Sequence, residues 1–169
     1  MILGQTRLLA TPFVPAGMVA CAGQTISAQD NPDLVYVLTR DEQASSVVVP
    51  AVPPQAPGVR WAMDVTGAVP WDEFGAADQL DPPFVGELVT FVPSFAEGFP
   101  AGELIRCDGG TLIVRDHVML FSAIGITFGG DGSSSFMVPE VASPVGSAMP
   151  YYIVGSTGVF PTRGSDWAA

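Results

Sequence analysis

The stretch from Cys107 to Pro139, CDGGTLIVRDHVMLFSAIGITFGGDGSSSFMVP, decides how the chain folds. It begins with a Cys-Asp-Gly-Gly turn, continues as an apolar segment that ends at Ile124-Gly125, and breaks at the glycine-rich run from Gly129 to Gly132. A second apolar run, Phe136-Met137-Val138, precedes the final proline. Because glycine and proline interrupt regular elements, this order predicts a turn, a short helix, a loop and a strand.

The helix is expected to start near Asp116, whose side chain is of the type that caps helix N-termini. Val118, Leu120, Phe121 and Ile124 follow at spacings that place them on one face of a helix. The segment is short, so we expect a helix of two to three turns that packs on one side only.

Much of this stretch has a counterpart earlier in the chain. Cys21-Ala22-Gly23-Gln24-Thr25 matches Cys107-Asp108-Gly109-Gly110-Thr111, and a Pro-Ala-Gly precedes each of the two. The spacing of 86 residues then holds as far as Leu38 and Ile124. Later segments correspond in the same order: Val49–Val52 with Val138–Val141, and Trp61–Pro70 with Tyr152–Pro161. Such ordered self-similarity predicts a tandem duplication.

The repeat predicts a division of the chain into a diverged first domain over residues 1–70, a linker over 71–83 and a second domain over 84–169. The linker is acidic and ends in a proline pair. Each domain is expected to be a small α+β unit, mostly short antiparallel strands with one short helix. In the first domain, Asp30 or Asn31 would cap the helix, with Pro32 in its first turn.

Composition narrows the range of functions. The chain has 169 residues, of which 48% are hydrophobic, so it can bury a substantial core. Its net charge is −11, and all six basic residues are arginines that form no cluster, which argues against nucleic acid as a partner. It has no apolar stretch long enough to insert into a membrane and no secretion signal at its start, so we expect synthesis in the cytoplasm.

The residues that usually carry catalysis or bind metals are scarce. Cys21 and Cys107 occupy equivalent places in the two copies, so we expect buried free thiols that are too far apart for a disulfide. His117 is the only histidine, which excludes a multi-histidine zinc site, and the nucleophile motif Gly-x-Ser-x-Gly does not occur. We therefore predict no catalytic residues, no metal and no cofactor.

A glycine-rich loop distinguishes the second copy from the first. The first copy runs from Thr39 to Ser46 without glycine, so only the second loop is expected to adopt positive-φ turns. We interpret it as a candidate surface loop for a ligand or receptor. Its residues are Gly129, Gly130, Asp131, Gly132, Ser133, Ser134 and Ser135.

These motifs suggest a family. Gly86-Glu87, Pro100-x-Gly102 and Cys107-Asp108-Gly109, followed by Phe128-Gly129-Gly130-Asp131-Gly132 and Phe136-x-Val138-Pro139-Glu140, closely resemble the phage tail collar domain. The same domain occurs in the microcystin-dependent protein group. The second copy resembles it over most of its length. The first copy is a diverged version, because Ala22 replaces the aspartate after the cysteine and the Gly-Gly-Asp-Gly loop is missing.

The resemblance implies a structural component of a bacteriophage tail, located in the virion as a tail fibre, collar or baseplate protein. It also implies other virion tail proteins as partners, a homo-oligomer with a trimer favoured, and no enzymatic activity. The alternative is a module at the tail tip that binds a host-surface receptor or glycan through Gly129–Ser135.

Overall fold

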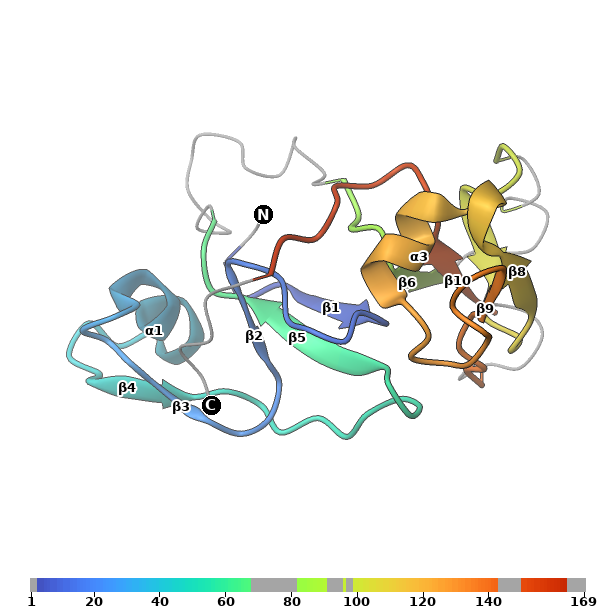
Figure 1. Ribbon diagram of the computed structural model, residues 1–169. Coiled ribbons are helices and arrows are strands. Elements are labelled where there is room, and N and C mark those ends of the chain that lie inside the picture. Colours follow the sequence, from blue (N-terminus) through green and yellow to red (C-terminus); the bar gives the residue numbers. More distant parts are fainter. Residues whose placement is uncertain (1–2, 68–81, 91–95, 97–98, 143–149, 164–169) are drawn as a thin grey trace.

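The computed structural model describes residues 3–67, 82–90, 96, 99–142 and 150–163. Short strands and a few short helices make up this part of the chain (Figure 1). In chain order they are β1 (Thr6–Leu9), β2 (Met18–Ala20), β3 (Thr25–Ser27), α1 (Pro32–Thr39), β4 (Ser46–Val48), β5 (Arg60–Asp64), β6 (Glu87–Thr90), β7 (Leu104–Arg106), β8 (Thr111–Ile113), the 3₁₀ helix η2 (Val114–Asp116), α3 (Val118–Ile124), β9 (Ser135–Met137) and β10 (Tyr151–Val154).

The largest sheet has six strands in the order β2-β5-β1-β6-β10-β7, and all its pairs are antiparallel. Its middle is the contact between β1 and β6, where Leu8 lies opposite Leu88 and Leu9 lies opposite Glu87. The Ala10 N–H extends this contact by donating to the Gly86 carbonyl over 2.9 Å. We call this strand pair the seam, because it joins the first half of the chain to the second.

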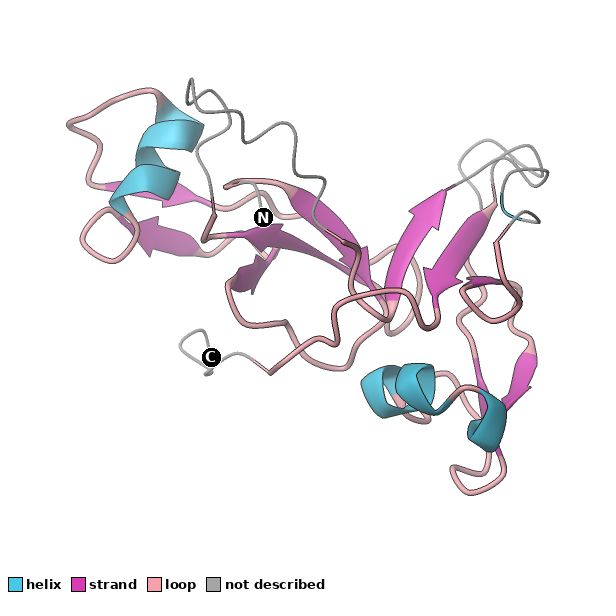
Figure 2. Cartoon of the chain, turned by 90° about the horizontal axis from the view of Figure 1, so that it is seen from above, coloured by secondary structure: helices cyan, strands magenta, loops and turns pink. Residues whose placement is uncertain are grey.

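Two small sheets lie toward opposite ends of the molecule (Figures 1 and 2). At one end β3 pairs with β4 beside α1. At the other end β8 pairs with β9, with η2 and α3 in the connection between them. The described part is therefore a small α+β structure of mostly antiparallel strands, as the sequence predicted.

The two halves repeat the same order of elements. The strand order is β2-β5-β1 in one half and β7-β10-β6 in the other. The Cys21 N–H donates to the Trp61 carbonyl, and the Cys107 N–H donates to the Tyr151 carbonyl, each over 2.9 Å. Trp61 thus corresponds to Tyr151, so the sequence pairing of Trp61 with Tyr152 was wrong by one residue.

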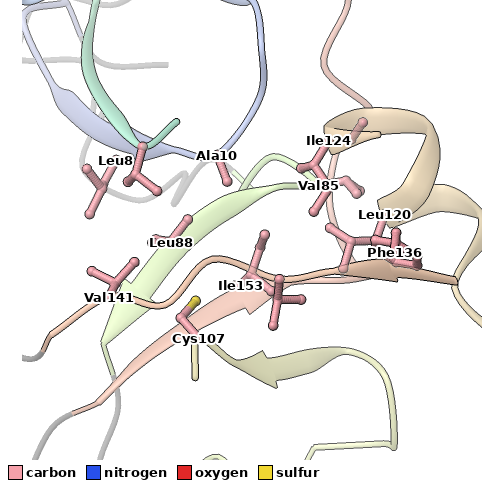
Figure 3. Packing of buried hydrophobic residues seen from close by; sticks show 13 residues of the cluster. Leu8, Ala10, Val85, Leu88, Cys107, Leu120, Ile124, Phe136, Val141 and Ile153 are labelled. Atoms are coloured by element: carbon pink, nitrogen blue, oxygen red, sulfur yellow. The ribbon is translucent and has the colours of Figure 1, made fainter. Parts of the chain in front are cut away.

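The main hydrophobic cluster contains residues from both halves (Figure 3). Leu8 and Ala10 come from the first half, and Leu120, Phe136 and Ile153 from the second. A second cluster around α1 lies within the first half. Its buried residues are Leu3, Val19, Cys21, Ile26, Leu34, Val37, Val49, Met63 and Val65. The halves therefore share a sheet and a core, and the separation into two domains stays a prediction.

Helix α1 starts where expected, with Asn31 at the N-cap position and a proline in the first turn, but the Asn31 side chain makes no capping hydrogen bond. It ends at Arg40, whose φ of 59° is in the left-handed region, so the expectation that only the second loop uses positive φ was wrong. The Arg40 N–H donates to the Tyr36 carbonyl over 2.8 Å, and this helix-closing bond holds the residue in that conformation.

Helix α3 starts later than the sequence indicated. Its N-cap is His117, because Asp116 belongs to the preceding 3₁₀ turn, in which the His117 N–H bonds to the Val114 carbonyl. Leu120 and Ile124 are buried as predicted, but Val118 is 56% exposed. The first two residues of α3, Val118 and Met119, are thus exposed, and burial of the helix begins at Leu120.

Both cysteines are buried free thiols, as the sequence predicted. The predicted linker over 71–83 lies outside the described residues except for its last two positions. In the described part of the chain, no helix combines the length and apolar character needed to cross a membrane.

Candidate functional site

The glycine-rich loop from Gly129 to Ser135 lies between α3 and β9. Strands β8 and β9 hold its base, with Leu112 opposite Phe136 in their register. The Phe136 side chain is fully buried and packs against Phe121 of α3 with ring centroids 5.3 Å apart. Two backbone bonds close the loop: the Met137 N–H donates to the Gly129 carbonyl, and the Gly132 N–H to the Ser135 carbonyl. The loop is therefore anchored to a packed element at its base.

The glycines are required by the backbone conformation, as predicted. Gly129, Gly130 and Gly132 have φ values of 122°, 104° and 70°. At Gly130, a Cβ atom would lie 2.4 Å from the Cα of Phe136, which no side chain can tolerate. The shape of this loop therefore depends on glycine.

Asp131 organises the rest of the loop. Its Oδ1 accepts hydrogen bonds from the N–H groups of Ser133, Ser134 and Ser135 over 2.7–2.9 Å, and its Oδ2 accepts one from the Ser134 hydroxyl. The Ser134 hydroxyl and then these backbone N–H groups hold the pKa of Asp131 well below its usual value. The carboxylate is thus ionised, and its hydrogen bonds are made to groups of the loop itself.

This arrangement limits what the loop can bind. Asp131, Ser133 and Ser134 are all exposed, but the carboxylate already accepts hydrogen bonds from the loop's own N–H groups and from the hydroxyls of both serines. Ile126 and Ile113 beside the loop are 58% and 49% exposed, and a Cβ on Gly132 would lie 3.0 Å from the Ile126 side chain. The loop surface thus combines an ordered backbone with aliphatic side chains, which suits contact with another protein. Ligand or receptor binding by the seven predicted residues stays a prediction.

A buried charge cluster at the seam was missed at the sequence level. Arg7 of β1 donates from Nε to Asp64 Oδ2 over 3.3 Å and from Nη1 to Glu87 Oε2 over 3.1 Å. Its guanidinium also lies over the ring of Phe84, 5.4 Å from the centroid. Arg7 is 4% exposed, Asp64 is fully buried and Glu87 is 8% exposed. Single charges within the apolar runs Arg7-Leu8-Leu9-Ala10 and Trp61-Ala62-Met63-Asp64-Val65 are the signal that could have revealed it.

Burial dominates the electrostatics of this cluster. It raises the pKa of Asp64 and of Glu87, and the nearby Arg7 guanidinium lowers both to a smaller extent. The Phe84 N–H, which donates to Glu87 Oε2 over 2.9 Å, also opposes the rise at Glu87. Asp64 Oδ1 has no hydrogen-bond partner among the described residues.

Two open cavities lie along the first half and the seam. The larger, about 540 Å³, is lined by Cys21, Pro53, Pro54, Trp61 and their neighbours. The smaller, about 410 Å³, lies over the seam between Trp61 and Tyr151. Arg7 and Glu87 of the charge cluster are in the lining of the smaller cavity. The described residues include no group of three or more His, Cys, Asp and Glu side chains that could hold a metal.

One segment in the second half of the chain matches a known family. Residues 86–145 match the family model of the Phage Tail Collar Domain. The match confirms the resemblance predicted from the motifs around Cys107 and Phe136, and it includes the whole glycine-rich loop. It indicates a structural protein of a phage tail. Residues 1–85 and 146–169 lie outside the matched segment. No curated protein and no solved structure is significantly similar to the chain.

Proposed function

We propose that this protein is a structural component of a bacteriophage tail that acts by assembling with other tail subunits and not by catalysis. The observation that carries the proposal is the collar-domain match over residues 86–145. The fold supports it, because the matched segment supplies strands β6 and β7 of the central sheet and most of the buried residues of the main core. We place the protein in the virion tail, after synthesis in the host cytoplasm.

We also propose that the first half is a second, diverged collar-like unit. Corresponding hydrogen bonds support this. The Gly4 N–H donates to the Asp64 carbonyl and the Gly86 N–H to the Val154 carbonyl, each over 2.9 Å. Likewise the Val52 N–H donates to the Cys21 carbonyl, as that of Val141 does to Cys107. Two units in one chain allow a trimer to present six related units to a sixfold partner.

Exposed apolar side chains support subunit contacts. Large exposed hydrophobic residues occur on both halves, where they would lose contact with water in an assembly. They are Tyr36, Leu38, Val48, Val52, Phe99, Ile113, Val118, Met119, Ile126, Val159 and Phe160. A net charge of −11 makes the subunits repel, so we expect the partner tail proteins to be more basic.

Native mass spectrometry of the full chain, alone and mixed with its neighbouring tail proteins, tests the assembly. We expect a trimer or a defined complex with a tail protein. A monomer or dimer that persists at high concentration and binds none of the tail proteins would contradict the proposal.

The alternative is a receptor-binding module at the tail tip, and the exposed Ser133 and Ser134 of the glycine-rich loop are the feature that favours it. A glycan array separates the two functions. The structural role predicts no specific glycan binding. Specific binding that is lost in Ser133→Ala, but kept in the control Ser122→Ala on the exposed face of α3, would establish the alternative.

A further inference from the structure

The Arg7–Asp64–Glu87 cluster joins the two halves of the molecule from within the central sheet. Arg7 and Asp64 lie on neighbouring strands of the first half, and Glu87 is the first residue of β6 in the second half. The bond from Arg7 Nη1 to Glu87 Oε2 therefore crosses the seam, beside the backbone bond from Ala10 to Gly86. Any change in the charge of this cluster acts directly on the contact between the halves.

The charges of the cluster do not balance. Two buried carboxylates, Asp64 and Glu87, face one buried guanidinium, that of Arg7. The chain's α-amino group also acts on Asp64, but its effect on the pKa of that carboxyl is the smallest of those that act there. Arg60 lies on the same face of β5 as Asp64 but is partly exposed, and no ion pair links it to either carboxylate. A buried charge without full compensation is costly, and the usual outcome is that the group binds a proton. The fully buried Asp64 Oδ1, which has no hydrogen-bond partner in the described part of the chain, marks where compensation is lacking.

We propose that the carboxylate pair Asp64 and Glu87 binds one shared proton in the folded protein, so that the seam is strengthened in mild acid and weakened as the pH rises. The proton brings the charge of the three side chains to zero. The two carboxylates interact with one guanidinium and with each other, so they titrate as a pair. The proton is therefore assigned to the pair and not to either residue alone.

The direction of the pH effect follows from the causes already described. Burial raises the pKa of both carboxyl groups in the folded protein, with smaller opposite effects from Arg7 and, at Asp64, from the chain's α-amino group. A group whose pKa is raised by folding stabilises the fold fully below its unfolded pKa, and this contribution is lost as the pH rises through the folded pKa. Stability should therefore fall from about pH 4 upward, starting near the ordinary carboxyl pKa values.

Urea unfolding of the full chain at a series of pH values tests this proposal. For the wild type we expect the unfolding equilibrium constant to rise with pH, by at most about tenfold per pH unit for one proton. Glu87→Gln keeps an oxygen that can accept from Arg7 and Phe84 but removes one negative charge. This variant should be more stable than the wild type at pH 8 and depend less on pH. Glu42→Gln, at an exposed position in the α1–β4 connection, is the matched control and should keep the wild-type slope.

Two further measurements keep the test decisive if a variant folds poorly. In the wild type, an NMR titration of side-chain carboxyl carbons should show a coupled pair with raised pKa values, and Asp64→Asn or Glu87→Gln should remove the coupling. The exchange protection of the Ala10 amide, corrected for the intrinsic rate, should fall with pH in the wild type only. A wild-type pair that is fully ionised at pH 4, or a Glu87→Gln protein with an unchanged pH slope, would overturn the proposal.

Discussion

At the scale of single residues, Asp131 determines the shape of the glycine-rich loop. Its carboxylate accepts bonds from three consecutive N–H groups and from the Ser134 hydroxyl, which no neutral side chain of the same size can reproduce with equal strength. Asp108 offers a natural comparison, because it makes the same kind of turn with one such bond, from the Gly110 N–H. These two aspartates differ mainly in how many donors they bind.

We therefore expect Asp131→Asn to lower the midpoint of thermal unfolding at pH 7 more than the control Asp108→Asn does. The pKa of Asp131 is lowered by folding, so its contribution is present above its unfolded pKa and is lost as the pH falls through the folded value. The difference between wild type and Asp131→Asn should shrink in strong acid. Equal midpoints for the two variants at pH 7 would show that the loop does not depend on this carboxylate.

The two thiols give a second prediction at this scale. Burial, and then the charge of Asp108, raise the pKa of Cys107 to about 12, and burial raises the pKa of Cys21. A thiol reagent at pH 8 should react slowly with the native protein and modify both cysteines after unfolding. Cys21 should react first, because it lines the larger open cavity. Faster labelling of Cys21→Ser than of Cys107→Ser would contradict this order.

At the scale of elements, the β8–α3–β9 segment depends on glycines at two distinct places. Gly130 packs against the backbone of Phe136, whereas a Cβ on Gly125 at the end of α3 would meet nothing within 4 Å. Both have positive φ, so both substitutions introduce backbone strain. Only the substitution at Gly130 also adds a steric clash.

Gly130→Ala should destabilise the protein by about 2–3 kcal/mol, because strain and overlap with β9 act together. Gly125→Ala, which introduces strain alone, should cost less. Denaturant unfolding of the two variants measures the difference. A Gly125→Ala protein that is as unstable as Gly130→Ala would mean that the close approach to Phe136 is relieved at no cost.

The elements also show what sequence can and cannot predict. The order of turn, helix, loop and strand around Cys107 was predictable, because glycine, proline and apolar spacing act locally. The start of α3 was not, since a 3₁₀ turn at Asp116 competes with a capped helix and leaves no separate sequence signal. The glycine-rich loop was found from its glycines, but the internal use of Asp131 depends on three-dimensional geometry.

At the scale of the whole molecule, the seam determines how the halves behave. The repeat suggested two units, but nothing in it indicated that β1 and β6 would pair edge to edge, because strand edges carry little sequence signature. Single charges within two apolar runs signalled the charged cluster at Arg7, but they do not show which residues pair. Its partners Asp64 and Glu87 are distant in sequence and meet only when both halves form one sheet.

A shared sheet and core predict a single cooperative unfolding transition. Leu8 is 3% exposed and lies opposite Leu88 in the seam, so Leu8→Ala should cost about 2–4 kcal/mol and lower the transition of the entire chain. Leu38→Ala, at a position 38% exposed on α1, should have a smaller effect. Calorimetry measures the unfolding transition of the wild type and of each variant. Two separate transitions in the wild type, only one of them shifted by Leu8→Ala, would show that the halves unfold independently.

The most direct test of the proposed role is to locate the protein in phage particles. Particles purified from cells that carry the gene would be labelled with gold-conjugated antibody against this chain and imaged by electron microscopy, with particles from a gene deletion as control. We expect gold at the tail and none on the control. Intact tailed particles that contain no detectable copy of the chain, or label confined to the head, would contradict a structural role in the tail.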